Sequence, residues 1–389
     1  MLASARPTEI SSPLSRPVAD EPIAVVSRPV GGQEWDWVVC GFDGICQEQL
    51  HSFASVRWPG VTLEPRLFEN NGRVVGGALM MVQVLPLGLG KVAIAKWAPM
   101  LADLRHPQAA ALYDGMVDAL VAEYADQRGM MISVVAHASP EQINPEYLAL
   151  TARGFRPGIS LPYPDRYLVR LGLSDDDQRR SLGQTWRRQL NKSEKAGLRF
   201  EHGRPGMLED FKVLYAAMTE RKQFPDHSAY ETLDRLMDLE EPLRPELFFV
   251  YHGETLVAGA LIFKAGDRAV YLYGATNEQA LPLRAGYFMH WNIIRWLRDN
   301  TKASWYDLGG TDGYSGLHQF KKGMVGEAGT IRALPPALNY ASRPMAYIMG
   351  TGALLAREAL LELRRWIDAR RPTGAKPDMP RPRLGRSMQ

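Results

Sequence analysis

Cysteine is nearly absent from this chain of 389 residues, which contains only Cys40 and Cys46. Two cysteines cannot form the disulfide framework that holds many small secreted domains together. No histidine or further cysteine lies beside them at zinc-binding spacing, so we expect no structural metal. The scarcity of cysteine therefore excludes the disulfide-rich secreted class, favours a reducing cytoplasm and predicts that both thiols serve packing.

Long hydrophobic runs are also lacking. No window reaches the roughly 18 apolar residues that a membrane span needs. The first residues, MLASARPTEISSPLSRPVAD, lack the apolar core of a secretory signal, and their polar, proline-containing composition predicts a disordered arm over residues 1–30. We expect a cytoplasmic protein that is dissolved or in peripheral contact with the inner membrane surface.

The overall charge shows little excess of one sign, because 46 Lys and Arg oppose 43 Asp and Glu and leave a net charge of +3. The positive residues are nevertheless unevenly placed. Residues 179–199 hold seven Lys or Arg against one Glu, and residues 364–386 hold eight against two Asp, which is +6 in each segment. Such segments are typical of sites for phosphate-rich or anionic partners, and equally of a solvated helix face and a solubilising tail.

The first half of the chain alternates strand and helix patterns. Residues 34–40 favour a strand and residues 47–56 a helix, and two strand-like runs then meet at the asparagine–glycine turn of residues 70–72, a hairpin signal. Residues 107–129 have helical spacing and end at a glycine, and residues 130–137 form a buried-strand run. A helix over 145–154 and a strand over 166–173 complete this half.

The second half repeats this order of a helix, an antiparallel meander, a helix and a strand. The repeated order resembles the GNAT acyltransferase fold, and we predict the α+β (mixed α/β) class with two tandem GNAT-like domains. The C-terminal helix is expected to be a strut packed on the second domain or an amphipathic surface that contacts a membrane. The predicted boundaries are an arm at 1–30, a first domain at 31–172, a second domain at 173–343 that includes a basic connecting helix packed where the halves meet, a C-terminal helix at 344–370 and a basic disordered tail at 371–389.

A glycine turn near the end of the second half is the first place where we expect chemistry. In YDLGGTDGYSGLHQFKKGM, a strand end opens into Gly309 and Gly310 and is followed by a short helix that carries Phe320, Lys321 and Lys322. Paired glycines let the backbone approach a ligand closely, and a lysine one turn later can contact a developing oxyanion or a phosphate.

This segment and several others, in their common order, resemble the FemABX family of aminoacyl-transferases, whose members build peptide bridges on cell-wall precursors. The resemblance covers most of residues 35–370. It implies transfer of an aminoacyl group from aminoacyl-tRNA to an amine of a peptidoglycan precursor, with no metal or other cofactor. Residues 200–247 are too few for the long helical hairpin of some members, so the chain resembles the compact form without a coiled-coil arm. The resemblance rests on SVRW, VQVLPLGLGKVAIAKWAPM and LALTARGFRPG, and on TWRRQLNKSEKAGLRF, AMTERKQF, VYLYGAT and the glycine–phenylalanine–lysine segment.

The resemblance assigns substrate-binding roles to residues outside the glycine turn. It places Arg57 and Arg221 as two cations facing the diphosphate of the precursor, which charge-assisted bonds would hold. A surface arginine beside Trp58 is the other interpretation of Arg57. Tyr271 and Tyr273 alternate along an expected strand, so we expect only one of them to face the site.

The catalytic roles fall on the segment around the glycine turn. Lys321 would stabilise negative charge on the ester carbonyl under attack, and Phe320 would stack on the terminal adenosine of the tRNA. A solvent-exposed lysine and a core phenylalanine are the other interpretations. Asp307 could orient the incoming amine, but we expect it to cap the turn. The pattern nominates no base for the attacking amine, whose pKa is near about 10.4.

A glycine-rich phosphate loop at a helix start is lacking from both halves, although GNAT enzymes that use acyl-CoA usually hold its pyrophosphate there. EQALPLRAGYFMHW offers only Arg284 and Gly286, and LADLRHPQAAALYDG has no glycine before Gly115. This pattern disfavours a CoA donor, while the resemblance implies aminoacyl-tRNA. The alternative is an N-acyltransferase that uses acyl-CoA or acyl carrier protein on another amine, in an envelope polysaccharide or a small amino compound. A non-catalytic binding protein of the same fold is a third interpretation, disfavoured by the retained glycine turn.

Overall fold

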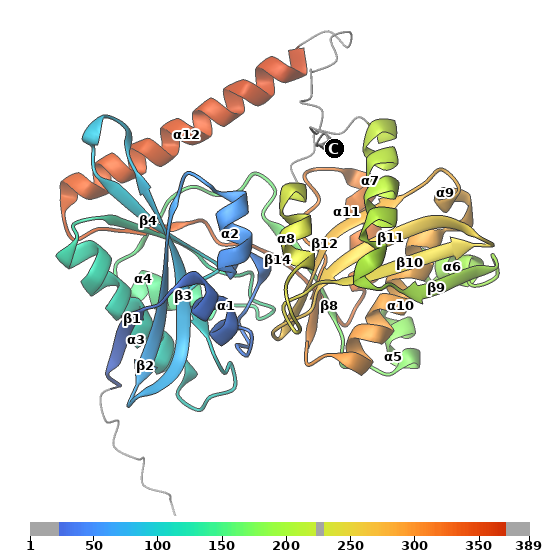
Figure 1. Cartoon of the computed structure of the whole chain (residues 1–389), viewed down its shortest axis with the longest axis horizontal. Coiled ribbons are helices and arrows are strands. Elements are labelled where there is room, and N and C mark those ends of the chain that lie inside the picture. Colours follow the sequence, from blue (N-terminus) through green and yellow to red (C-terminus); the bar gives the residue numbers. More distant parts are fainter. Residues whose placement is uncertain (1–22, 223–228, 371–389) are drawn as a thin grey trace, which may run out of the picture.

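Two mixed β-sheets organise the chain, one in each of two lobes (Figure 1). The computed structural model describes residues 23–222 and 229–370. Most of the predicted arm and the whole predicted tail over residues 371–389 lie outside this part of the chain. The mixed sheets, flanked by helices, confirm the α+β (mixed α/β) class.

The first lobe is built on an eight-stranded sheet. Its strands β1 to β4 form an antiparallel meander, and β6 lies parallel to β4. Asn71 and Gly72 both have positive φ and form the predicted hairpin turn between β2 and β3. The sheet order is β1 (Val25–Pro29), β2 (Thr62–Asn70), β3 (Arg73–Val84), β4 (Lys91–Lys96), β6 (Met131–Val135), β15 (Leu338–Tyr340) and β7 (Arg156–Pro157), with β5 (Met100–Leu101) paired to β3. The helices are α1 (Gly32–Val39), α2 (His51–Arg57), α3 (Ala109–Leu120), which continues as a π-helical segment (Val121–Gln127), and α4 (Pro145–Ala152).

The second lobe repeats this plan on a seven-stranded sheet. A meander of β9 to β12 is followed by α10 and then by β13, which lies parallel to β12. The common order confirms two tandem GNAT-like domains. The sheet order is β14 (Thr330–Ala333), β8 (Asp165–Arg170), β13 (Trp305–Asp307), β12 (Arg268–Thr276), β11 (Thr255–Phe263), β10 (Glu246–His252) and β9 (Leu198–His202). The helices are α5 (Asp175–Ser181), α6 (Gln184–Ser193), α7 (Leu208–Lys222), α8 (Leu233–Met237), α9 (Ala280–Leu283), α10 (Ala285–Asn300) and α11 (Ser315–Val325).

The two lobes exchange one strand each. β8 follows the first lobe in sequence but pairs with β13 and β14 of the second sheet, whereas β15 follows the second lobe but pairs with β6 and β7 of the first. The predicted division at residue 172 therefore does not coincide with the sheets, because strand pairing joins segments far apart in sequence. The predicted arm over residues 1–30 also differs, since Val25–Pro29 pairs with β2.

The strand predicted over residues 34–40 is wrong, because this segment forms the helix α1. Trp35 and Val39, four positions apart, are fully buried, as on one face of a helix. The Asp36 carboxylate accepts hydrogen bonds from the backbone N–H groups of His51 and Ser52 at 2.7 and 3.0 Å. These bonds satisfy free donors at the start of α2, so Asp36 connects the two helices.

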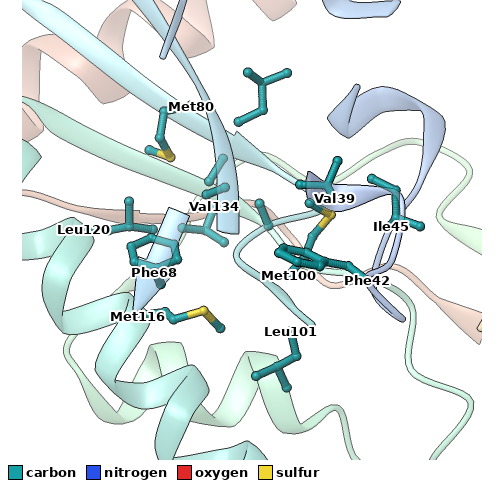
Figure 2. Packing of buried hydrophobic residues seen from close by; sticks show 14 of the residues in the cluster. Val39, Phe42, Ile45, Phe68, Met80, Met100, Leu101, Met116, Leu120 and Val134 are labelled. Carbon is teal, nitrogen blue, oxygen red and sulfur yellow. The ribbon is translucent and has the colours of Figure 1, made fainter. Parts of the chain in front are cut away.

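One continuous core joins the lobes. Figure 2 shows Phe68 of β2 with Met116 and Leu120 of α3 in the part of this core that lies in the first lobe. The same cluster includes Phe263 and Val270 from strands of the second sheet. The lobes are therefore held together by shared apolar burial, and residues on either side of their junction have fixed relative positions.

Two helices pack elsewhere than the sequence predicted. The basic helix α6 contacts α10 and α11 and buries Trp186 in the core of the second lobe, away from the junction. The C-terminal helix α12 (Pro344–Arg370) packs on β4, β6 and β15 of the first lobe, where the sequence predicted a strut on the second domain. Within the two described stretches, no helix combines the length and the apolar content needed to cross a bilayer.

Candidate active site between the two lobes

A cavity of about 1010 Å³ lies between the lobes and is lined from both. In the first lobe it borders the ends of β4 and β6, where their parallel pairing stops at Lys96 and Val135. In the second lobe it borders β12 and β13, which pair from Arg268 to Val270. Each sheet thus contributes the region where the pairing of its parallel strands ends.

The glycine turn reaches this cavity through Gly309. The Lys321 ammonium on α11 donates hydrogen bonds to the carbonyl oxygens of Leu308 and Gly310, at 2.5 and 2.6 Å. Gly309 has φ +74°, a conformation that favours glycine, and a Cβ at this position would lie 3.9 Å from Lys321 Nζ. The absence of a side chain therefore leaves the space next to the ammonium open on the cavity side.

Lys321 is only 6% exposed, which contradicts the alternative of a solvent-exposed lysine. Burial, reinforced by the nearby positive charge of Arg166, lowers the pKa of Lys321 to about 8. Lys321 is not among the residues that line the cavity, whereas Gly309, next to its ammonium, is. The predicted role next to a reacting carbonyl is compatible with this placement and stays a prediction.

Asp307, at the end of β13, has both the turn and two cations as partners. Its Oδ1 accepts a hydrogen bond from the N–H of Gly309 at 2.8 Å, which is the expected capping contact. Its Oδ2 accepts one from Arg166 at 3.0 Å and lies 3.8 Å from Arg268 Nη1. Burial alone would raise the pKa of Asp307, but the two guanidinium groups outweigh it and hold the pKa below its usual value.

Arg268 links the carboxylate to the first lobe. It lies 3.8 Å from an Asp307 carboxylate oxygen and donates a hydrogen bond to the carbonyl oxygen of Ala138 at 2.9 Å. The neighbouring His137 lines the cavity, with Nδ1 at 3.7 Å from a carboxylate oxygen of Glu146. The histidine–carboxylate pair and the glycine turn thus border the same cavity.

Trp97 separates the histidine from a second ion pair. Its ring lies 5.3 Å from the ring of His137, and its indole N–H donates to Glu48 at 2.5 Å. Lys96 Nζ lies 2.6 Å from the same carboxylate, which keeps the pKa of Glu48 low although burial opposes this. Trp97 has φ +59°, unusual for a bulky residue. Such strained backbone often marks functional sites.

The two predicted diphosphate ligands have different positions. Arg57 lines the cavity and forms an ion pair of 2.6 Å with Glu231 of a short 3₁₀ helix, η5 (Tyr230–Thr232), in the second lobe. Arg221, near the end of α7, donates to the carbonyl oxygen of Thr276 at 3.0 Å and is not one of the residues that line the cavity. Lys96 instead provides the second cation on this side, with Nζ 5.4 Å from the ring centre of Trp58.

Tyr271 and Tyr273 both border the cavity, so the expectation that only one faces the site is wrong. In a regular strand, residues two apart share a face. Here a β-bulge pairs the two tyrosines with consecutive residues of β11, and they turn to different neighbours. Tyr271 packs against His290, and the Tyr273 hydroxyl donates to the carbonyl oxygen of Ala229 at 2.7 Å. Burial raises the pKa of both phenols.

Phe320 packs inside the second lobe. Its ring lies 4.9 Å from that of Tyr287, 5.6 Å from His290 and 6.1 Å from Trp186. It is partly buried and is not a cavity-lining residue. This position matches the alternative of a core phenylalanine, and stacking on an adenosine stays a prediction.

Reasoning from the sequence missed several charged and aromatic residues that line the cavity. Lys96 and Trp97 lie within a run that carries the family resemblance, and an aromatic residue directly after a strand end was the available signal. Arg166 and Arg268 have partners more than 100 positions away, so spacing could not reveal these contacts. The missed residues are Glu48, Lys96, Trp97, His137, Glu146, Arg166 and Arg268.

Comparison with known families supports the fold of the second lobe. Residues 178–322 match the family described as an acetyltransferase (GNAT) domain. The matched segment starts in α5 and ends in α11, and it therefore contains the glycine turn and Lys321.

Solved structures show the same two-lobed arrangement. FemX has a TM-score of 0.65 at 17% identity, over 81% of this chain and 97% of that one. The C-terminal domain of a lysylphosphatidylglycerol synthetase from Agrobacterium fabrum has a TM-score of 0.51 at 15% identity, over 85% of this chain and 97% of that one. At these identities the similarity concerns the fold, and in the fold the resemblance to the FemABX family is confirmed.

A curated relative matches a shorter segment. The lipid II:glycine glycyltransferase of Staphylococcus aureus is 30% identical over 99 residues, which are 24% of this chain and 22% of that protein. The chain thus matches about a fifth of the length of this relative.

Proposed function

We propose that the chain is an acyltransferase that moves an aminoacyl group from aminoacyl-tRNA to an amine of a peptidoglycan precursor. The observation that carries this proposal is the glycine turn, which is held by the buried ammonium of Lys321 and opens through Gly309 onto a charged cavity between two GNAT-like lobes. The similarity to a protein named lipid II:glycine glycyltransferase supports the choice of acceptor.

The reaction requires an amine to replace an alcohol on a carbonyl carbon. The amine nitrogen attacks the ester carbon, a C–N bond forms, and the C–O bond to the ribose of the tRNA breaks. Negative charge develops on the carbonyl oxygen during the attack. An ammonium has three N–H donors, of which Lys321 uses two on the turn carbonyls, and the third would donate to this oxygen across the space at Gly309.

The attacking amine must lose a proton, and the departing ribose oxygen must gain one. His137 is the side chain that we assign to proton transfer, because it lines the cavity and an imidazole is the group most often used for this purpose. Glu146 lies 3.7 Å from Nδ1 and accepts a hydrogen bond from the backbone N–H of His137 at 3.0 Å. The carboxylate therefore holds the backbone of His137 in place beside the cavity.

The acceptor would bind with its diphosphate near Arg57 and Lys96. These cations flank Trp58 and belong to the cavity lining, where each already has one carboxylate partner. A diphosphate would compete with Glu231 and Glu48 for them through charge-assisted hydrogen bonds. Aminoacyl-tRNA is made in the cytoplasm, so the proposal places the reaction there, at the inner membrane surface when the acceptor is lipid-linked.

An acyl-CoA donor is the second candidate function. The match of residues 178–322 to an acetyltransferase (GNAT) domain favours it. Against it stands the start of α10, where the single linking residue Arg284 and Gly286 in the first turn replace a glycine-rich phosphate loop. The two candidates share the lobes, the turn and an amine acceptor, and they differ in the leaving group.

A donor competition assay separates these candidates. Purified full-length protein is incubated with a nucleotide-linked or lipid-linked peptidoglycan precursor and, in turn, with labelled aminoacyl-tRNA, acetyl-CoA or acyl carrier protein thioesters. We expect label in the precursor from aminoacyl-tRNA alone. Transfer from a thioester but not from aminoacyl-tRNA would overturn the leading proposal.

A further inference from the structure

α12 presents an apolar stripe on the outside of the first lobe. Five large apolar side chains of this helix are each more than half exposed. At about 100° per residue they fall within an arc of roughly 140° along about 27 Å of helix. They are Met345, Ile348, Leu355, Leu360 and Leu363. Tyr347 and Leu354, by contrast, pack against Leu85 and Met131, so the first lobe already occupies another face of the helix.

A leucine at the tip of the neighbouring hairpin is exposed as well. Leu87 connects β3 to β4, is 95% exposed and has φ +58°. Positive φ is costly for a bulky residue, and a strained backbone that displays a leucine to solvent has no folding benefit. Leu85, two positions earlier, packs against α12, and Figure 1 shows the hairpin beside this helix. The exposed leucine tip therefore lies beside the helix that carries the stripe.

We propose that this surface docks on an anionic lipid bilayer. We call it the membrane face and define it by Leu87 and the five exposed residues of α12. Residues 364–386, which continue from the stripe, hold eight Lys or Arg against two Asp. An apolar stripe followed by a basic segment matches the interfacial layer of a bilayer, where apolar side chains enter beneath negatively charged headgroups.

A second copy of the chain is the competing occupant of the membrane face. A dimer formed through α12 would bring two segments of +6 charge into one assembly, where like charges repel. An anionic surface neutralises the same charge. The charge distribution therefore favours the bilayer.

This inference rests on the proposed function only for the reason why a bilayer would be useful, namely a lipid-linked acceptor. Binding is measured without turnover, so its failure can be told apart from failure of the proposed chemistry. Full-length protein is sedimented with vesicles of phosphatidylcholine alone, or with about one quarter phosphatidylglycerol added. We expect binding to the anionic vesicles only, weakened by added salt and by neutralising Arg381, Arg383 and Arg386 to Gln.

The apolar contribution is tested by Leu87→Asp and by Ile348→Asp combined with Leu355→Asp. Each variant is expected to weaken vesicle binding by at least about tenfold and to keep the melting temperature of the wild type, because the replaced side chains are exposed. Val213→Asp, which replaces an exposed apolar residue on α7 of the second lobe, is the matched control and should bind like the wild type.

Two results would overturn the proposal. One is unchanged vesicle binding in the folded membrane-face variants. The other is a wild-type protein that does not bind anionic vesicles but forms a dimer in light scattering, when the same variants are monomers. That second result would assign the face to another copy of the chain.

Discussion

Arg166 and Asp307 are 141 positions apart in sequence, yet the guanidinium donates a hydrogen bond of 3.0 Å to the carboxylate beneath the glycine turn. The contact exists because β8 leaves the first lobe and pairs with β13 in the second sheet. The exchanged strand therefore places the positively charged Arg166 next to the Asp307 carboxylate. It also links the position of the turn to the junction of the two lobes.

Replacing Asp307 by Asn should destabilise the protein and distort the turn. The amide keeps the size of the side chain but leaves the positive charge of Arg166 without its main partner. Breaking a buried ion pair in this way costs about 3–5 kcal/mol, and we expect about 2–3 kcal/mol because Arg166 is partly exposed. Urea unfolding measures the change. Asp165→Asn, on the exposed end of β8, is the control, and an equal effect of both substitutions would contradict the role of the pair.

Removing the ammonium of Lys321 should abolish most activity. Lys321→Met is expected to lower the rate of transfer by about 10²–10³, the usual effect of losing one oxyanion donor. Lys322→Met changes an exposed lysine on the same helix and should leave the rate near that of the wild type. Steady-state transfer assays give the comparison. A Lys321→Met enzyme with normal turnover would remove the proposed electrostatic role.

The lowered pKa of Lys321 also predicts how stability depends on pH. The pKa is about 8 in the folded protein and 10.5 in an unfolded chain, so the unfolded state binds more protons between these values. The cost of burying the ammonium is therefore present in full below pH 8 and is lost as pH rises toward 10.5. Relative to Lys321→Met, the wild type should gain free energy of unfolding over this range, by at most about 3 kcal/mol. Denaturant unfolding at several pH values tests this, and a constant difference would show that the ammonium is not perturbed.

The order of elements in the fold could be predicted from the sequence because it depends on local patterns. The turn at residues 70–72 and the helical spacing of α3 are visible within short windows. The exchange of strands is not visible in a short window. The sequences of β8 and β15 are those of ordinary strands, and their partners lie in the other half of the chain. A strand was predicted where Gly32–Val39 forms a helix, because Trp35, Trp37 and Val39 also alternate as in a strand. Burial of one helical face in the tertiary structure favours the helix.

The candidate site divides in the same way. Gly309, Gly310 and Lys321 could be found because a glycine pair and a nearby lysine form one local motif. The β-bulge between Tyr271 and Tyr273 depends on the pairing register with β11, and the residue pattern does not predict this register. Arg268 and the backbone of Ala138 meet only after the lobes pack, so their contact is a property of the tertiary structure.

The positions of the two predicted diphosphate ligands lead to different expectations. Arg57→Ala should weaken binding of a nucleotide-linked precursor by about tenfold or more, since a charge-assisted hydrogen bond is worth about 1.5–3 kcal/mol. Arg221→Ala should change the dissociation constant little, because Arg221 bonds the backbone of β12 and is outside the cavity lining. Titration calorimetry with the precursor measures both. The opposite ranking would restore Arg221 as a ligand and would require the end of α7 to move when substrate binds.

The proton-transfer role of His137 is open to a chemical-rescue test. His137→Ala should lower the transfer rate by about 10²–10⁴ while binding of the precursor is retained, because general acid–base catalysis contributes a factor of this size. Added imidazole should restore part of the rate by occupying the space of the lost ring beside Glu146 and Trp97. His252→Ala, at an exposed hairpin turn, should show neither the loss nor the rescue. The contrary outcome is a His137→Ala variant that loses activity, is not rescued by imidazole and has a lowered melting temperature. In that case the ring serves to pack against Trp97, and another group accepts the proton.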